Sequence, residues 1–293
     1  MSCNSIHTNR KHWLHALFSV SHTYYGQQIL PPYGSYTSPQ KKFRARDEVE
    51  VIESIRLTGQ RFGDQVRRVF LADGDATVLP TRRLLTILAA IREHMPAVRR
   101  ISSYCLPRNL RKKSQQEIDE LAAAGLSMVY VGAESGDDRV LAAVNKGETF
   151  ETTCEALDKL GAAGITRSVM ILNGLGGRIY SRQHAENSAR LANATQSEYL
   201  ATLVVSFPQG EQRLRAGFPE WEPLDQHELF VEMEQFLSQL ELRRTVFRSD
   251  HASNWLVLKG TLGADKERLL AQVRQAVAAP EAARLRPAWA RGL

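Results

Sequence analysis

Acidic residues and glycines gather where short apolar runs of the chain end, and these residue types suit a small-molecule site. The segments are 73–75 (Asp-Gly-Asp), 103–105 (Ser-Tyr-Cys), 132–136 (Gly-Ala-Glu-Ser-Gly), 173–177 (Asn-Gly-Leu-Gly-Gly) and 206–210 (Ser-Phe-Pro-Gln-Gly). Glycine lets the backbone approach a ligand closely, and carboxylates suit ribose hydroxyls or an ammonium group better than phosphate. In one turn a glycine is explained by chain reversal alone, but several such turns on one face predict a ligand site.

The glycine run at 174–177 lacks the chemistry of a phosphate-binding loop. It has neither the spacing of the dinucleotide fingerprint nor the lysine of a Walker loop. We therefore expect no nucleotide-phosphate site there.

Short apolar strands alternate with amphipathic helices from about Phe43 onward. Strands are expected at 68–72, 101–104, 128–131, 168–172, 199–205 and 245–247. Helices are expected from Asp47, after Pro80, from Ser114, at 149–163, at 181–194, from Asp225 and at 265–278. The helices at Asp47, Ser114 and Asp225 each have a glutamate three residues after the cap residue, the pattern of a capping box. The alternation predicts parallel strands with right-handed crossovers.

This order predicts an α/β fold, a partial parallel (β/α) barrel, with an open doubly wound sheet as the alternative. In both folds the chemistry lies at the carboxyl ends of the strands, where the glycine-acid segments stand. We expect an irregular segment at 1–40, one barrel domain at 41–278 and a solvated basic tail at 279–293.

The composition favours a soluble protein with one sizeable core. The chain has 293 residues, 43% apolar content and a net charge of +6. Its basic flanks carry no aromatic-basic platform, so we do not expect nucleic-acid binding. The apolar run at 14–20 is far shorter than the ~20 residues that span a bilayer. Three widely spaced cysteines form no disulfide framework, which favours a reducing cytoplasm.

Three of the strand-end segments resemble motifs of the radical S-adenosylmethionine (SAM) superfamily. Segment 69–76 is similar to its second-strand segment, where a Gly-Gly-Glu-type turn meets the methionine amino group of SAM; here the turn is Asp-Gly-Asp. Segment 130–141 resembles the G-x-E-S-G motif after the fourth strand, and Asn-Lys-Gly follows at 145–147. Segment 171–177 resembles the fifth-strand glycine motif beside the adenine. Segment 247–254 resembles a loop of a bacterial subgroup related to oxygen-independent coproporphyrinogen oxidase, and we assign it no role.

The resemblance implies a radical-SAM-like barrel of the TIM-barrel type that binds SAM and acts on a small-molecule substrate. The residues that it implies for SAM binding are Asp73, Gly74, Asp75, Glu134, Ser135, Gly174 and Gly176. Family members are iron-sulfur oxidoreductases, in which a 4Fe-4S cluster cleaves SAM to a 5′-deoxyadenosyl radical. The resemblance names no catalytic side chain, and the sequence indicates no oligomeric state.

The cysteine triplet that holds this cluster is missing. Thiolates spaced C-x-x-x-C-x-x-C hold such clusters, and segment 36–44 resembles the stretch that follows them in the family. Alignment of that stretch puts Gly26, Leu30 and Tyr33 at the ligand positions. The resemblance therefore implies a chain that binds SAM but is inactive in radical chemistry.

Three explanations for the missing triplet stay open. In the first, residues before about Gly34 come from a shifted reading frame or a wrong gene model. In the second, the protein is a cluster-free relative that binds SAM or a substrate. In the third, Cys105 and other residues hold a metal in a new arrangement. Two other classes of function are also open. One is a lyase or hydrolase that uses Asp73, Asp75 and Glu134 as acid-base groups or divalent-metal ligands, and the other is a non-catalytic binding module.

The remaining cysteines and histidines favour structural roles. We interpret Cys105 as a small buried or rim thiol and Cys154 as packed core within a helix. Cys3 and the histidines at 7, 12, 15 and 22 belong to the irregular start, and their spacing indicates no metal site. His251 stands beside Asp250, and it either forms an acid-base pair with it or is a surface or substrate-contacting residue.

Overall fold

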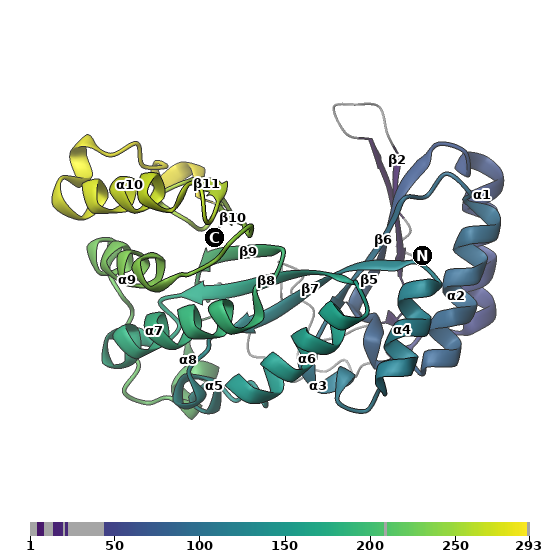
Figure 1. Ribbon diagram of the computed structural model, residues 1–293, viewed down its shortest axis with the longest axis horizontal. Helices are drawn as coiled ribbons and strands as arrows, with labels where there is room; N and C mark the ends of the chain where they lie inside the picture. The colour runs from purple at the N-terminus through teal and green to yellow at the C-terminus, as the bar shows by residue number, and fades with distance from the viewer. Residues whose placement is uncertain (1–4, 9–13, 20, 23–43, 208–209, 292–293) are drawn as a thin grey trace. The chain divides into compact units, whose positions relative to one another are not determined.

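The computed structural model describes residues 5–8, 14–19, 21–22, 44–207 and 210–291 (Figure 1). They belong to two compact units, one formed by Met1–Val131 with Lys159–Arg167 and the other by Gly132–Asp158 with Ser168–Leu293. The sequence predicts one barrel domain over 41–278, and the structure divides that range between these two units.

The first unit contains part of the main sheet, a separate sheet of two short strands, and helices packed against the main sheet. Its strands are β1 (Ser5–Thr8), β2 (Leu14–Ser19), β3 (Ser21–His22), β4 (Arg44–Ala45), β5 (Val66–Asp75), β6 (Arg100–Cys105) and most of β7 (Leu126–Glu134). Its helices are α1 (Glu48–Phe62), η1 (Ala76–Val78), α2 (Thr81–His94), α3 (Pro107–Leu110) and α4 (Gln115–Ala123). Strands β2, β5, β6 and β7 pair in parallel, and β1 pairs with β2 in the antiparallel direction.

The second unit follows the same plan. Its strands are most of β8 (Thr166–Asn173), β9 (Tyr199–Val204), β10 (Val246–Ser249) and β11 (Leu258–Thr261). Its helices are α5 (Asp138–Ala143), most of α6 (Phe150–Ala162), α7 (Gly177–Thr195), α8 (Gln212–Gly217), α9 (Gln226–Gln239), α10 (Lys266–Ala278), η2 (Pro280–Ala282) and η3 (Ala288–Ala290). Strands β8, β9 and β10 are parallel, and β11 is antiparallel to β10.

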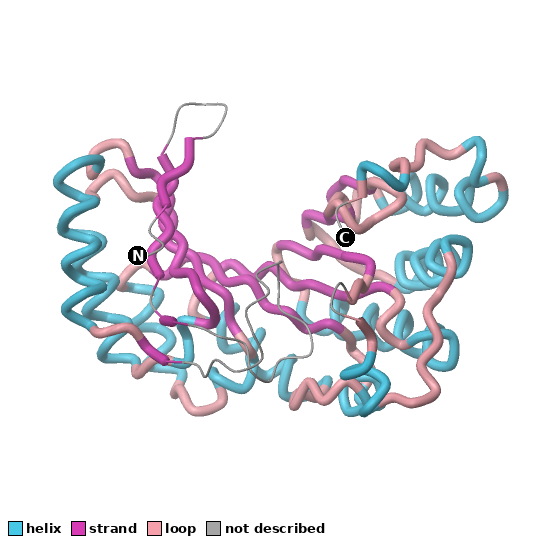
Figure 2. The backbone as a smooth tube through the Cα atoms, turned by 180° about the vertical axis from the view of Figure 1, so that it is seen from behind, coloured by secondary structure: helices cyan, strands magenta, loops and turns pink. Residues whose placement is uncertain are grey.

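The predicted fold class, α/β with mostly parallel strands joined by helices, is confirmed (Figure 2). Local signals account for the helix starts. Asp47 accepts hydrogen bonds from the backbone N–H groups of Val49 and Glu50 at the start of α1. Ser114 and Asp225 form complete capping boxes with Glu117 and Glu228 at the starts of α4 and α9.

Alternating burial builds the core of the first unit. Val69, Ile101 and Val129 point to the face of the sheet that α1, α2 and α4 cover, and each is at most 1% exposed. The residues next to them along each strand point to the opposite face, because side chains alternate along a strand. Figure 1 shows these helices on one side of β5 and β6.

The N-terminal segment differs from the prediction of an irregular stretch over 1–40. Ser5–Thr8 and Leu14–Ser19 form strands β1 and β2, and β2 pairs with β5 with Leu17 opposite Phe70. The hydrogen bonds of β2 come from a strand far along the chain, so its short apolar run did not identify it. Cys3, His12 and the cluster-equivalent positions Gly26, Leu30 and Tyr33 lie outside the described residues.

The C-terminal segment is also better ordered than a solvated tail. Arg286 donates through Nη1 to the carbonyl oxygens of His251 and Asn254, and through Nη2 to that of Asp250. Arg291 donates to the Ser253 carbonyl at 2.8 Å, and its guanidinium lies 3.7 Å from the ring centroid of Trp255. The correction has a physical reason: three carbonyl groups of the 250–254 loop accept hydrogen bonds from the several N–H donors of one guanidinium group.

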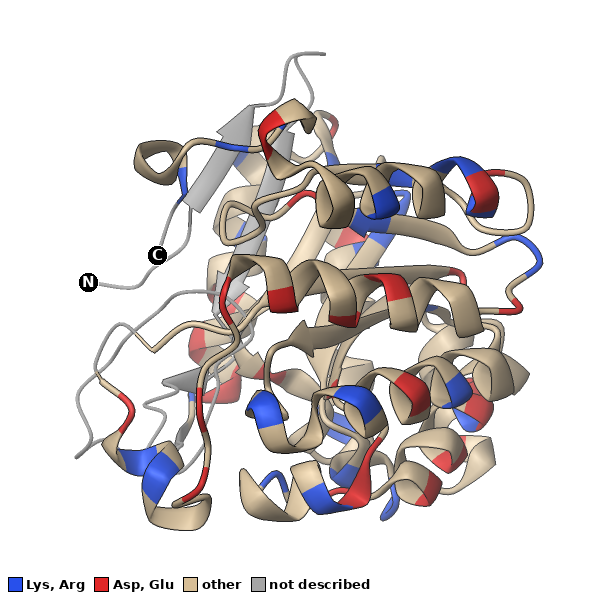
Figure 3. Ribbon diagram, turned by 90° about the vertical axis from the view of Figure 1, so that its left-hand side faces the viewer, with Lys and Arg blue, Asp and Glu red and all other residues tan. Residues whose placement is uncertain are grey.

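Charged side chains otherwise lie along the helices. Figure 3 shows acidic and basic residues interspersed on them. Among the described residues, no helix has the length and apolar character needed to cross a membrane.

We expect Arg286→Ala to lower the free energy of unfolding by about 2 kcal/mol, because it removes charge-assisted hydrogen bonds to three carbonyls. Urea unfolding followed by circular dichroism measures this. Arg284→Ala is the matched control, because Arg284 is an exposed arginine two residues away. Equal stability of the two variants would contradict the role given to Arg286.

Candidate functional site

The Asp-Gly-Asp turn lies at the carboxyl end of β5, in the first unit. The register between β5 and β6 shifts there, with Leu71 opposite Ser103 and Asp75 opposite Tyr104. Residues 72–74 therefore have no partners on β6, as in a bulge. Gly74 has a φ of 114°, a conformation that side chains disfavour. The backbone of this turn is thus not paired with β6. The side chain of Asp73 lies outside the described part of the chain.

Asp75 has a structural role in this turn. Its carboxylate accepts four hydrogen bonds, from Thr77 N at 2.7 Å, Thr77 Oγ1 at 2.5 Å, Leu106 N at 2.5 Å and Asn109 Nδ2 at 2.7 Å. Burial raises the pKa of Asp75, and these four bonds oppose the rise. A carboxylate has about four acceptor sites, so the protein itself occupies them. Asp75 therefore ties the end of β5 to the segment after β6, and SAM contact through it stays a prediction that the geometry does not favour.

The two described cysteines have ordinary surroundings. Cys105 is buried at the end of β6, where Thr77 Oγ1 lies 3.6 Å from its sulfur. This agrees with its interpretation as a packed thiol. Cys154 is half-buried on α6 rather than in the core, and burial raises its pKa to about 11.

Glu134 ends β7 in the second unit and has an unusual backbone. Its φ of 65° is left-handed, which is rare for a residue with a side chain and typical of functional sites. Its side chain is buried, and Oε1 accepts a hydrogen bond from Lys146 Nζ at 2.9 Å. A Cβ atom on Gly132 would lie 2.3 Å from Oε1. The glycine at 132 is therefore required for the carboxylate to fold back over the strand.

Ser135 faces the protein rather than solvent. It is 0% exposed, its Oγ lies 2.8 Å from His184 Nδ1, and it accepts a hydrogen bond from Asp137 N at 3.0 Å. The next residue, Gly136, donates through its N–H to Ser188 Oγ at 2.9 Å. The Glu-Ser-Gly turn is thus fastened to α7, and the position of Ser135 favours a structural role over the predicted SAM contact.

Asp137 completes this attachment. Its carboxylate caps α5 by accepting from Arg139 N and Val140 N, both at 3.0 Å. It also accepts from Gln183 and Asn187 of α7.

The glycine turn 174–177 after β8 is packed by protein on several sides. Gly174 has a φ of 82° and donates through its N–H to Glu232 Oε1 at 2.6 Å. Trp221 Nε1 donates to the Leu175 carbonyl at 3.1 Å, and a Cβ on Gly177 would lie 2.7 Å from the Trp221 ring. A Cβ on Gly176 would lie 3.0 Å from the backbone of α7. Close packing therefore explains these glycines without a ligand.

Two buried titratable residues that the sequence did not single out lie beneath these turns. Glu232 of α9 is 2% exposed, and its Oε2 accepts from Ser181 Oγ at 2.6 Å. Burial raises the pKa of Glu232 to about 7, although Ser181 and Gly174 donate to it. His184 is equally buried, and its Nε2 lies 4.0 Å from Glu232 Oε1. Burial lowers the pKa of His184 to about 4, although its bond to the Leu172 carbonyl and the charge of Asp137 favour protonation.

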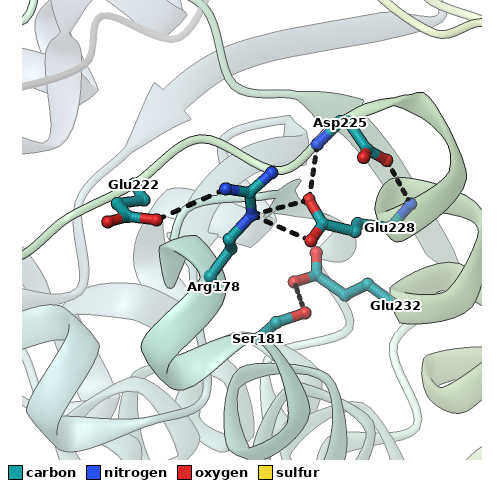
Figure 4. A network of polar contacts seen from close by, with 6 residues as sticks. All are labelled: Arg178, Ser181, Glu222, Asp225, Glu228 and Glu232. Atoms are coloured by element: carbon teal, nitrogen blue, oxygen red, sulfur yellow. Dashed lines mark hydrogen bonds and ion pairs between the residues drawn. The ribbon is translucent and has the colours of Figure 1, made fainter.

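Figure 4 shows the polar contacts between α7 and α9 on the Glu232 side of this pair. Ser181 reaches Glu232 from α7. One helical turn from Ser181, Arg178 donates to both oxygens of Glu228 and pairs with Glu222 at 3.3 Å. Glu228 also accepts from Asp225 N, so a single carboxylate caps α9 and holds Arg178. Nothing in the sequence distinguished Glu232 and His184 from other polar residues of amphipathic helices.

The 247–254 loop, to which the sequence assigned no role, holds the end of β9. Ser253 Oγ and Asn254 Oδ1 both accept from Val204 N, at 3.1 and 2.8 Å. Asp250 pairs with Lys259 at 2.8 Å, and His251 Nδ1 lies 2.9 Å from Ser253 Oγ. His251 thus belongs to the polar network of this loop, in which Asp250 pairs with Lys259, and its acid-base pairing with Asp250 stays a prediction.

The structure distributes the predicted site residues over both units. Asp73, Gly74 and Asp75 lie in the first unit, and Glu134, Ser135, Gly174 and Gly176 lie in the second. Within the second unit, Ser135 and Gly174 connect to the same buried pair, His184 and Glu232. Lys146, the partner of Glu134, is part of the Asn-Lys-Gly sequence at 145–147, so that pattern was a usable signal for it.

The cysteines of this chain do not fit a 4Fe-4S cluster. The cluster is held by thiolates, and the chain has only three cysteines, none in a C-x-x-x-C-x-x-C pattern. Cys154 is held as a thiol by its raised pKa, because a pKa of about 11 leaves little thiolate at neutral pH. In the parts that the structure describes, no three histidine, cysteine, aspartate or glutamate side chains are grouped to hold a metal.

The chain belongs to the radical SAM superfamily, which matches residues 24–192, more than half of its length. No curated protein matches it. Among solved structures, it is similar to coproporphyrinogen III oxidase (HemN) from Escherichia coli, with a TM-score of 0.51 and 14% identity over 66% of this chain and 46% of that one. It is also similar to methylornithine synthase (PylB), with a TM-score of 0.52 and 13% identity over 78% of this chain and 63% of that one.

The radical SAM methyltransferase TsrM from Kitasatospora setae matches less well, with a TM-score of 0.45 and 18% identity over 55% of this chain. The chain covers 31% of TsrM, so it spans about a third of that protein's length. At these identities the likeness is one of fold. The HemN and PylB structures confirm the predicted radical-SAM-like partial barrel.

We expect Glu232→Gln to remove a pH dependence from the stability of the fold. The folded pKa of Glu232, about 7, lies above its ordinary value of 4.5. Its stabilising contribution is therefore complete below pH 4.5 and is lost as the pH rises to about 7. Above pH 7 the variant should exceed the natural chain in free energy of unfolding by up to about 3 kcal/mol.

Urea unfolding at pH 5, 6, 7 and 8 measures this difference. Glu234→Gln is the control, because Glu234 lies on the same helix and pairs with Arg274 at the surface. The folded pKa of His184 is lowered, so its contribution to stability increases as the pH rises from 4 to 6.5, opposite to that of Glu232. The free energies of unfolding of the variant and the natural chain are therefore compared at each pH. Parallel pH profiles for Glu232→Gln and the natural chain would disprove the burial effect.

Proposed function

We propose that this chain is a SAM-binding member of the radical SAM superfamily that does not generate the 5′-deoxyadenosyl radical. Family membership supports SAM as the ligand, and the cysteine content supports the loss of cluster chemistry. When a cluster is bound, family members obtain from it the electron that cleaves SAM. No step of that kind is assigned to this chain.

The observation that carries the proposal is the geometry of Glu134. Lys146 occupies Oε1, whereas Oε2 has no protein donor among the described residues. The left-handed backbone and the glycine at 132 hold the carboxylate in this position at a cost in strain. Such a carboxylate can accept hydrogen bonds from an ammonium group or from ribose hydroxyls, which are the donors that SAM carries.

Other groups of the second unit keep Glu134 in place. Ser135 is anchored to His184 and to Asp137 N, so the residue after Glu134 cannot rotate freely. Small-molecule binding is thus the function class that these features favour.

Isothermal titration of the 293-residue chain with SAM tests the first half of the proposal. We expect saturable binding, and Glu134→Gln should weaken it about tenfold because a charge-assisted hydrogen bond is lost. Glu222→Gln is the control, since Glu222 is an exposed carboxylate that pairs with Arg178. Thermal unfolding of each variant separates loss of binding from loss of fold. Absence of SAM binding by the natural chain would overturn the proposal.

Iron and acid-labile sulfide, measured after anaerobic reconstitution, test the second half. We expect near-zero iron together with retained SAM binding. About four irons per chain, with reductive cleavage of SAM, would show that other ligands hold a cluster and would overturn the cluster-free function.

A further inference from the structure

The sheet of the first unit has a second face that the SAM proposal does not use. Phe70 of β5, Tyr104 of β6 and Tyr130 of β7 lie together on it, with ring centroids 4.9, 5.8 and 6.2 Å apart. All three side chains are half-buried, whereas Val69 and Val129 on the opposite face are buried under helices. The three rings, here called the aromatic cluster, therefore keep part of their surface open.

Two arginines stand beside this cluster on the same face. Arg68 and Arg100 are directly opposite each other in the parallel register of β5 and β6. Side chains two residues apart on a strand share a face, so Arg68 lies next to Phe70, about 7 Å away along β5. Arg100 donates a hydrogen bond to the sulfur of Met128. Met128 is in register with Ser102 on β6, and Ser102 is in register with Phe70 on β5, so Arg100 points to the same face as Phe70.

Neither arginine has a carboxylate partner among the described residues. Arg68 is exposed, and Arg100 is half-buried with a weak contact to Met128 Sδ at 3.7 Å. The Nε–H of Arg100 is buried and has no acceptor in the described part of the chain. Like charges directly opposite in a sheet repel, and a buried N–H without an acceptor is also unfavourable. An anion placed between the two guanidinium groups would relieve the repulsion between them.

We propose that this face binds a small aromatic carboxylate, whose carboxylate lies between Arg68 and Arg100 and whose ring lies on the aromatic cluster. Two guanidinium forks match the geometry of a carboxylate. The spacing of about 7 Å between Arg68 and Phe70 suits a ring and a carboxylate joined by a short linker. The site lies in the first unit alone, so it stands whether or not SAM binds.

Titration calorimetry with 3-phenylpropionate tests the site, with 3-phenylpropanamide as the neutral probe and acetate as the ring-free anion. We expect the natural chain to bind 3-phenylpropionate saturably and at least about tenfold tighter than either comparison compound, because each lacks one of the two interactions. Arg100→Gln should remove the preference for the acid over the amide. Phe70→Leu should weaken the binding of both ring compounds while it preserves apolar volume.

Arg99→Gln is the matched control, because Arg99 is an exposed arginine directly before β6 and its loss changes the net charge equally. Arg68→Gln changes an exposed side chain, so it tests the site even if Arg100→Gln disturbs the fold. No preference for the acid in the natural chain, or equal effects of Arg99→Gln and Arg68→Gln, would overturn the proposal. Titrations with and without SAM keep failure of this site distinct from failure of SAM binding.

Discussion

Glu232 lies on α9 with its carboxylate buried against the N–H of Gly174 and the hydroxyl of Ser181. Because a buried carboxylate must be satisfied by donors, its position determines where the turn after β8 and the start of α7 can lie. His184 lies on the same helix as Ser181 and contacts Ser135, the residue that follows Glu134. The position of this helix therefore also restricts the turn after β7. The strand-end turns of the second unit are therefore held by hydrogen bonds to the buried side chains of Glu232 and His184.

A carboxylate that accepts hydrogen bonds also fixes a strand end in the first unit. Asp75 accepts four hydrogen bonds and joins the end of β5 to Leu106 and Asn109. In both units an acid near a glycine-rich turn is a structural acceptor. Residues that resemble a ligand-binding motif thus divide into those that build the turn, such as Asp75 and Ser135, and those that the turn presents, such as Glu134.

Membership in the radical SAM superfamily suggests SAM binding, whereas the absence of a thiolate triplet argues against a cluster. The structure offers a physical reason why the two can occur together. The G-x-E-S-G turn keeps a strained, ion-paired carboxylate whose second oxygen has no donor among the described residues. Strain of this kind persists only where surrounding contacts support it, and here Gly132, Lys146 and Ser135 do so. A binding site can be retained by such contacts independently of the residues that would hold a cluster.

The sequence by itself determined the features that depend on near neighbours. Capping residues marked the starts of α1, α4 and α9, alternating patterns located most strands, and the G-x-E-S-G segment indicated the family. The cysteine count, which needs no structure, argued against a cluster. These signals are local, because a helix cap or a strand alternation is complete within a few residues.

Only the tertiary structure decided which polar atoms are already satisfied. The strand at 14–19 needed β5 as its partner, Ser135 needed His184 some fifty positions later, and Arg286 needed the carbonyls of the 250–254 loop. The adjacency of Arg68 and Arg100 likewise arises from strand register. Hydrogen-bond satisfaction and charge pairing depend on groups distant in the chain, so composition and periodicity do not contain them.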